Sequence, residues 1–337
     1  MSDGMVEVVS RYFVSGWASA NEAGPVHVQA ECRGQILGVA KANLTRPDLQ
    51  HNLQTLHAFI VGFPNAISPD DVQDVRVRVW GSATALPNEH RIRYDTRAPC
   101  QVFIVGSPRS GTSELGATLA AQLDLPWLGE GHAAPAFATA ADALKGDANS
   151  PDDLLRFMAE QGSAQFAYDA ARQAYYFMHG SASFLDKTPG MPMILATPFL
   201  SACFPSSFII FLRRNGISNV LSRMAKFGGD FEEHCNDWAG AMNAWDKIKR
   251  DLPHFLELEQ EIMLTSPGSA AHLISEYLTR PDACDGIAAA LQIGNHERTG
   301  AGIGKDKLAT TGWSPLQTNQ FKELCGPTMI RWGYSLE

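Results

Sequence analysis

The strongest indication of the fold comes from residues 101–113, Gln101-Val-Phe-Ile-Val-Gly-Ser-Pro-Arg-Ser-Gly-Thr-Ser113. The mainly apolar run Gln101–Val105 is typical of a buried strand. It leads into Gly106 and Gly111, which enclose Arg109, and a helical pattern follows. A strand, a glycine-rich turn and a helix start leave backbone N–H groups pointing at one place, and the helix dipole favours an anion there. The stretch therefore predicts a phosphate-binding strand–loop–helix unit.

This loop differs from the one that binds nucleoside triphosphates. Where that loop carries lysine after the second glycine, this chain has Thr112, and its cation, Arg109, comes two residues before the glycine. A metal-bound triphosphate is therefore disfavoured, and a monophosphate-like group near Arg109 fits better, with hydroxyls from Thr112 and Ser113 as further donors. The alternative is an ordinary helix N-terminus capped by Ser or Thr.

A second candidate anion site follows the apolar run of residues 206–212. This run ends in Arg213 and Arg214, and two charges at the end of a buried strand are unfavourable unless an anion or a carboxylate meets them. Ser222 comes eight residues after Arg214, and two helical turns can return it to the guanidinium. The pair predicts a second phosphate site; a salt bridge with a helix cap is the alternative.

The chain changes character after Pro99. From there on, short apolar runs alternate with longer helical patterns, which predicts an α/β domain at 99–337, with a P-loop-like parallel sheet flanked by helices. Ligands of such sheets bind at the carboxyl ends of the strands. The expected strands are Val102–Val105, Ser183–Leu185, Phe208–Leu212 and Phe255–Leu258, and the expected helices are Thr112–Leu123 and Pro151–Phe177.

Residues 1–98 have the alternation of β-strands. Apolar and polar residues alternate on both sides of Arg33-Gly34, which predicts a hairpin, and again over residues 74–80. Strands at this spacing predict a small all-β sandwich. Ser15-Gly16-Trp17-Ala18, followed later by Arg46-Pro47-Asp48-Leu49, resembles a β-module found beside bacterial glycan-modifying transferases. A packing or dimerisation module is the alternative.

Composition excludes several classes of protein. The net charge is −9, without a basic stripe, so a nucleic-acid partner is not expected. The six cysteines form no C-x-x-C pair, which disfavours disulfides and zinc. No signal-peptide core or apolar run of membrane-spanning length occurs, and we expect a soluble, cytoplasmic protein with no transmembrane segment.

Three motifs, in order, resemble those of the sulfotransferases. Pro108–Ser113 is similar to their 5′-phosphosulfate loop, and Arg214–Ser222 is similar to their 3′-phosphate motif. Between them, Asp186-Lys187-Thr188-Pro189 resembles a tetrad of glycan sulfotransferases. The resemblance covers roughly residues 100–337, and it implies 3′-phosphoadenosine 5′-phosphosulfate (PAPS) as donor, with no metal.

The resemblance also assigns residues to the donor. It implies that Arg214 and Ser222 bind the 3′-phosphate, and that Lys305, in the stretch 302–305, lies in a loop closing over it. Arg109 would stabilise charge on the leaving phosphate. The 5′-phosphate would bind to Arg109, Ser110, Gly111, Thr112 and Ser113. Two departures stand out: Glu114 replaces a tryptophan that many members place near adenine, and Gly216 replaces the usual proline, which is expected to loosen the turn.

Transfer to a hydroxyl requires a base for the acceptor's proton. Glu130 and His132 resemble a Glu-x-His pair of some glycan sulfotransferases, in which either residue could serve. Asp186 is the rival base, and Lys187 is expected to neutralise the transferring group. A turn-capping histidine and a structural Asp186–Lys187 pair are the alternatives. The acidic run Asp230–Glu233 is expected in a flap or solvated loop.

The resemblance thus implies transfer of a sulfuryl group from PAPS to a hydroxyl of a glycan, glycolipid or small metabolite, in a chain that is a possible homo-oligomer. Two other functions stay open. A metal-dependent P-loop kinase or NTPase would use the same loop, with Asp186 as the acidic metal ligand. A glycan-binding protein without catalysis would retain the transferase fold.

Overall fold

The computed structural model describes residues 3–19, 25–43, 57–63, 67–95, 100–147, 150, 152, 154, 156, 164–294 and 307–336. The chain divides into two compact units. One comprises Met1–Pro99 and Asp169–Ala182, and the other comprises Cys100–Tyr168 and Ser183–Glu337. The domain division at residues 98 and 99 stays a prediction, because the later segment Asp169–Ala182 is grouped with the first unit.

A four-stranded parallel sheet is the centre of the second unit. Its order is β11-β10-β8-β9, with β8 at Gln101–Gly106, β9 at Phe184–Lys187, β10 at Phe208–Arg213 and β11 at Leu256–Glu259. Every residue of β8 is buried, as expected for an inner strand covered on both faces. The chain leaves β8 for β9 on one side and later adds β10 on the other, so the end of β8 is the topological switch point where ligands bind.

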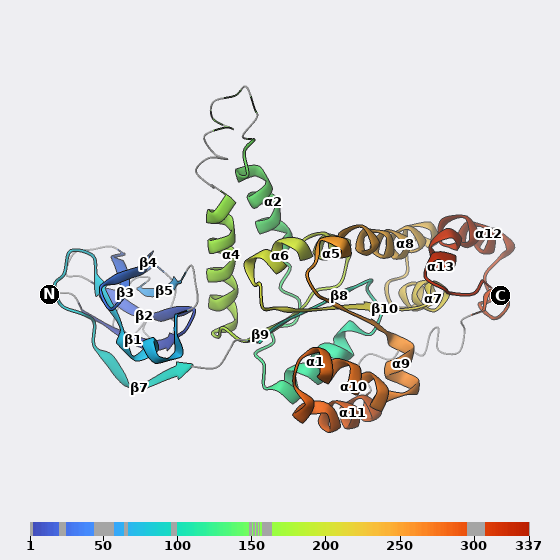
Figure 1. Ribbon diagram of the computed structural model, residues 1–337. Helices are drawn as coiled ribbons and strands as arrows, with labels where there is room; N and C mark the ends of the chain where they lie inside the picture. The colour runs from blue at the N-terminus through green and yellow to red at the C-terminus, as the bar shows by residue number, and fades with distance from the viewer. Residues whose placement is uncertain are drawn as a thin grey trace. The chain divides into compact units, whose positions relative to one another are not determined.

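Helices cover both faces of this sheet. Figure 1 shows α5, α6 and α8 along one face, and α1, α10 and α11 along the other. The helices are α1 Thr112–Leu123, α2 Ala134–Leu144, α4 Ala164–His179, α5 Met191–Leu195, α6 Thr197–Cys203, α7 Gly216–Phe227, α8 Phe231–Ile248, α9 Gln260–Thr265, α10 Pro267–Tyr277, α11 Cys284–Ile293, α12 Pro315–Leu324 and α13 Gly326–Arg331.

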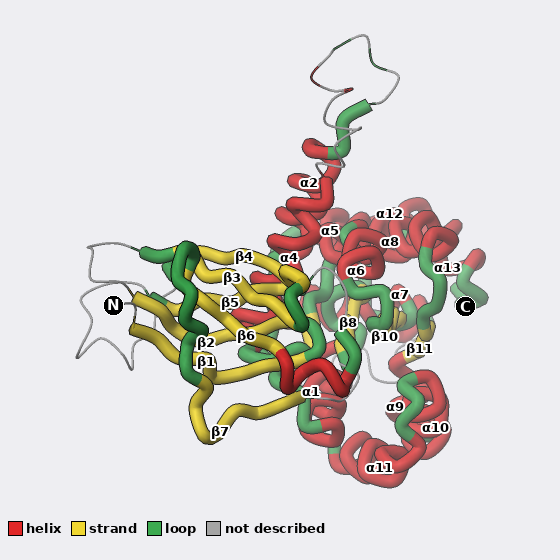
Figure 2. Tube along the Cα trace, turned by 60° about the vertical axis from the view of Figure 1, so that its left-hand side comes forward, coloured by secondary structure: helices red, strands yellow, loops and turns green. Residues whose placement is uncertain are grey.

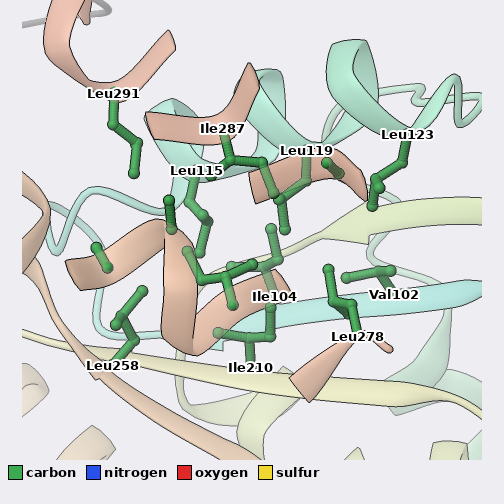
Figure 3. Packing of buried hydrophobic residues seen from close by; sticks show 14 of the residues in the cluster. Val102, Ile104, Leu115, Leu119, Leu123, Ile210, Leu258, Leu278, Ile287 and Leu291 are labelled. Atoms are coloured by element: carbon green, nitrogen blue, oxygen red, sulfur yellow. The ribbon is translucent and has the colours of Figure 1, made fainter. Parts of the chain in front are cut away.

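The core of the second unit forms where α1, α10 and α11 meet the sheet. Figure 3 shows Val102, Ile104 and Ile210 from the strands pointing toward Leu115 and Leu119 of α1. All five are fully buried. Apolar burial of this kind is worth roughly 25 cal/mol per Å², and here it fixes the first turn of α1 against the end of β8. The residues that follow the strands are thereby held in place.

The first unit contains two small sheets, whose strands are drawn in yellow in Figure 2. One has the order β5-β2-β1-β7 and the other β4-β3-β6. Alternate residues of the strands are buried in a core of their own, as in a sandwich. The strands are β1 Asp3–Ser10, β2 Phe13–Ser19, β3 His27–Cys32, β4 Gln35–Lys41, β5 Ala58–Gly62, β6 Val75–Val79 and β7 Asn88–Asp95.

The predicted fold class is confirmed: a small all-β sandwich precedes a P-loop-like parallel sheet flanked by helices. One local expectation is wrong. The acidic run Asp230–Glu233 is not a flap or loop but the start of α8, with Asp230 as the N-cap that accepts a hydrogen bond from the Glu233 N–H. No helix among the described residues is long and apolar enough to cross a membrane.

Candidate functional site

The first anion site is the loop between β8 and α1. Gly106 ends the strand with a φ of 155°, and a Cβ there would clash with the Leu212 carbonyl oxygen of β10. Gly111 precedes α1 with a φ of 90° and has no side chain to cap the helix. The N–H groups of the first turn therefore lie at the switch point without a side-chain cap from Gly111, which suits an anion.

Arg109 projects from this loop in a strained conformation. Its φ is 70°, in the left-handed region that non-glycine residues rarely adopt. Its Nε donates to Ser222 Oγ at 3.2 Å, and its carbonyl oxygen accepts from Arg214 Nη1 at 2.9 Å. The loop after β8 and the motif after β10 thus meet, because Gly106 and Leu212 are paired in the parallel sheet. The two predicted phosphate sites lie side by side.

The two arginines at the end of β10 have different environments. Arg213 pairs with Glu259 at 3.1 Å and lies against the rings of Trp332 and Tyr334, so a carboxylate and aromatic rings meet it. Arg214 is only 6% exposed. Burial and then the positive charge of Arg109 lower the pKa of Arg214 to about 10. Arg214 is therefore the arginine whose charge an incoming anion would stabilise.

Helix α7 holds Arg214 and Ser222 in this place. Asn215 caps the helix by accepting from the Ile217 N–H at 2.9 Å, and the Arg214 carbonyl accepts from Trp238 Nε1 at 3.1 Å. Ser222 is buried on the side of the helix that meets Arg109. Gly216, expected to loosen the turn, instead makes room for α8, because a Cβ there would lie 2.9 Å from the Trp238 ring.

The remaining residues assigned to the donor differ in burial. Ser110 is fully buried, its N–H donates to the Ser107 carbonyl, and its hydroxyl accepts from Asn219 at 3.1 Å. Thr112 is buried and Ser113 is half-buried in the first turn of α1. Lys305 lies outside the described residues.

Glu114 also begins α1, in its first turn. Its carboxylate lies against Gly294 at the end of α11, where a Cβ would clash with it. The side chain that stands in the tryptophan's position is thus buried, at 5% exposure, beside the end of α11.

Glu130, His132 and Lys187 form a chain of charged groups. Lys187 Nζ lies 2.6 Å from Glu130 Oε1, and His132 Nε2 lies 3.2 Å from Glu130 Oε2. The Lys187 side chain is 5% exposed and that of His132 is 66% exposed, so the chain runs from the interior to the surface. His132 adopts a φ of 50°, which the loop 129–133 imposes. A carboxylate so placed can orient an imidazole for proton transfer.

Asp186 lies beside this chain and bonds to Thr188. Its Oδ1 accepts from Thr188 Oγ1 at 2.6 Å, and Thr188 Oγ1 in turn accepts from the Gly131 N–H at 3.0 Å. Asp186 is 1% exposed. These bonds tie the loop after β9 to the loop of Glu130, while Lys187 pairs with Glu130. The role of Asp186 as base stays a prediction.

The two halves of the site are connected through the sheet. The Thr188 N–H donates to the Ile104 carbonyl, and the Gly190 N–H donates to the Gly106 carbonyl at 2.8 Å. Lys187 packs its stem on α1, because a Cβ at Gly116 would lie 3.3 Å from Lys187 Cβ. The charged chain therefore lies beside the start of the anion loop.

Sequence reasoning missed Thr188 and Asn219 as parts of the site. Thr188 belongs to the tetrad, and a hydroxyl two residues after Asp186 is well placed to bond to it. Asn219 is three residues before Ser222 and so shares its face of α7, which was the available signal. Among the described residues, no three His, Cys, Asp or Glu side chains are grouped so that they could hold a metal.

Comparison with known proteins identifies the family. Residues 99–283, more than half of the chain, match the model of the sulfotransferase family, and the chain belongs to that family. The matched segment contains the anion loop, the tetrad and the Arg214–Ser222 motif. No curated protein matches the chain.

Three solved structures illustrate the similarity. The sulfotransferase domain of the olefin synthase of Synechococcus PCC 7002 is 17% identical, over 72% of this chain and 97% of that one, with a TM-score of 0.44. A sulfotransferase from Mycobacterium avium is 11% identical, over 72% and 79%, with a TM-score of 0.41. A sugar kinase from Janibacter sp. HTCC2649 is 15% identical, over 56% and 98%, with a TM-score of 0.31.

Proposed function

We propose that this sulfotransferase transfers a sulfuryl group from PAPS to a hydroxyl of an acceptor. The observation that carries the proposal is the meeting of Arg109 and Arg214 at the switch point, beside a helix start capped only by glycine. The lowered pKa of Arg214 reflects burial and, after it, the like charge of Arg109, an arrangement that binding of anionic groups relieves. A donor with two separate phosphates on one nucleoside suits two adjacent cationic sites.

The loop and α7 would bind different parts of the donor. The first turn of α1, with Thr112 and Ser113, would hold the 5′-phosphate, and Arg109 would lie next to it. Arg214 and Ser222 would hold the 3′-phosphate. Lys305 is proposed to close over that phosphate on the strength of the family motif alone. PAPS supplies an activated sulfuryl group, and arginine, always protonated near neutral pH, can only stabilise charge there.

In this proposal the chain of charged groups acts on the acceptor and on the group being transferred. His132, the most exposed member, would accept the proton of the acceptor hydroxyl, and Glu130 would hold the imidazole in orientation. Lys187 Nζ, fixed by Glu130 within a buried position, would offset negative charge on the transferring group. Asp186 would hold the loop of Glu130 through Thr188.

The proposal also covers the class of acceptor, the cellular location and the need for a metal. We infer a glycan, glycolipid or small metabolite as acceptor, since the Glu-x-His pair and the tetrad resemble those of glycan sulfotransferases. A cytoplasmic location fits the use of PAPS, and donor binding is expected to need no metal. The acidic net charge gives no support for a nucleic-acid partner.

Calorimetry of ligand binding tests the donor. Adenosine 3′,5′-bisphosphate should bind with equal affinity in the presence and absence of magnesium, and more tightly than ATP does. A preference for Mg-ATP would overturn the proposal and favour a kinase or NTPase. Bisphosphate binding without turnover of PAPS on any acceptor panel would favour a binding protein.

Replacement of Arg214 by Ala tests the 3′-phosphate site. Loss of a charge-assisted hydrogen bond should weaken adenosine 3′,5′-bisphosphate by about 1.5–3 kcal/mol. Adenosine 5′-monophosphate should be weakened less, because Arg214 acts on its site only through the bond to the Arg109 carbonyl. The matched control is Arg213→Ala, whose guanidinium is already paired with Glu259. An equal loss for both ligands in Arg214→Ala would reject the assignment.

A further inference from the structure

Asn219 of α7 is fully buried and contacts the anion loop at two points. Its Nδ2 donates to the Pro108 carbonyl at 3.0 Å and to Ser110 Oγ at 3.1 Å. Its Oδ1 lies 3.5 Å from Ser107 Oγ. A buried amide whose two N–H groups are both used inside the protein has no donor left for a ligand. Asn219 therefore acts on the loop rather than on anything that binds in it.

These contacts enclose the strained residue of the loop. Pro108 and Ser110 flank Arg109, and the Arg109 carbonyl itself accepts from Arg214. Three successive residues of the loop are thus hydrogen-bonded to side chains of the Arg214–Ser222 motif. A left-handed φ at a non-glycine residue persists only where its surroundings over-determine it, and these bonds supply that constraint.

We propose that Asn219 is a positioning residue that holds the anion loop in the conformation that binds the 5′-phosphate. The proposal rests on the proposed function, because it takes the loop to be the 5′-phosphate site. Asn219 would keep the loop N–H groups and Arg109 aimed at one place before the donor arrives. This preorganisation would increase the affinity for the donor, because less free energy is then needed to order the loop on binding.

The chemistry of the amide distinguishes this role from simple packing. Only a side chain with two N–H donors can satisfy both the Pro108 carbonyl and Ser110 Oγ, and an apolar residue of similar volume can fill the space without either bond. Asn219→Leu keeps the branching of the side chain without its hydrogen-bonding groups, and Asn219→Ala removes the bonds without crowding. Leucine and alanine are both better helix formers than asparagine, so neither variant should weaken α7 itself. Both variants stay neutral, so neither repels an anion.

Calorimetry with three nucleotides gives the first test. In Asn219→Leu and Asn219→Ala, adenosine 5′-monophosphate and adenosine 3′,5′-bisphosphate should each bind at least ~10-fold more weakly. Adenosine 3′-monophosphate should change less than ~2-fold, because its site on Arg214 and Ser222 is kept. The control is Asn243→Ala in α8, where an exposed asparagine accepts from Thr328 and does not touch the loop. An equal loss for all three nucleotides would overturn the proposal.

Hydrogen exchange of the ligand-free protein gives a second test that needs no ligand. Amides of residues 106–111 should exchange faster in both Asn219 variants, while those of β11 and α10 keep their wild-type rates. Unchanged exchange in the loop would reject the positioning role even where binding falls. If the wild-type chain itself binds no bisphosphate but the loop amides respond as expected, the proposed function fails and the loop constraint stands.

Discussion

At the first position of α7, Gly216 lies against the ring of Trp238 and the sulfur of Met329. Trp238 is fully buried and donates to the Arg214 carbonyl, so the close approach at Gly216 brings α8 next to the motif that would bind the 3′-phosphate. Glycine is required here by lack of space and not by an unusual φ. A departure from the family pattern is thereby explained by packing.

Gly216→Ala should destabilise the protein, although alanine is the better helix former. A Cβ would lie 2.9 Å from both neighbours, and overpacking of this kind costs about 1–3 kcal/mol. Gly268→Ala, in the first turn of α10 with no atom within 4 Å, is the matched control and should be neutral or slightly stabilising. Chemical unfolding of the two variants measures the difference. A stable Gly216→Ala protein would contradict the packing argument.

Single substitutions distinguish the two candidates for the catalytic base. His132→Ala should lower kcat by about 10²–10⁴-fold, since general-base catalysis typically contributes that factor. Asp186→Asn should lower kcat much less, because Asp186 is buried and bonded to Thr188. The kcat of both variants at saturating acceptor provides the measurement. A large loss of kcat in Asp186→Asn alone would exchange the two roles.

The start of α8 was not predictable from its composition. Asp230, Glu232 and Glu233 after two glycines are as typical of a solvated loop as of a helix N-terminus, where carboxylates meet the positive end of the dipole. The structure chooses the helix because Phe231 and His234 are buried and pin its first turn. The acidic run is therefore part of a rigid element next to the site.

Asp230→Ala should destabilise α8 by about 1 kcal/mol, since it removes the side chain that caps the Glu233 N–H. Glu232→Ala removes an equal charge from the exposed face of the same turn without removing a cap, and should change stability by less than ~0.5 kcal/mol. Thermal unfolding of both variants at equal salt distinguishes capping from charge. Equal effects of the two variants would reject the N-cap role.

The strands and the first helix of the second unit were predictable because their signals are local. The expected strand Phe208–Leu212 became β10, and the expected helix Thr112–Leu123 became α1, since apolar runs and glycines act within a few residues. The pairing of Glu130 with Lys187 and of Asn219 with the loop was not predictable. These contacts join elements far apart in the chain, and only the strand order β11-β10-β8-β9 brings them together.

The packing of the first unit depends on a helix from the middle of the chain. Tyr176 of α4 is buried and stacks on Phe13 of β2 with ring centroids 5.2 Å apart. Tyr176→Ala should lower the stability of the first unit by about 3 kcal/mol, as for other large buried rings. Phe177→Ala, at a ring that is 46% exposed, is the neighbouring control and should have little effect. Hydrogen exchange of the β1 and β2 amides measures both, and equal protection in the two variants would contradict the packing role.

The participation of Asp169–Ala182 in the first unit has a consequence for biosynthesis. The ribosome completes Met1–Pro99 roughly 80 residues before it completes that helical segment, a delay of about 4–16 seconds at ~5–20 residues per second. During this interval the nascent sandwich has its strands but not the ring of Tyr176 that covers Phe13. An apolar surface of the sandwich therefore stays uncovered during this interval, when β8 is the one described strand of the transferase sheet that has been synthesised.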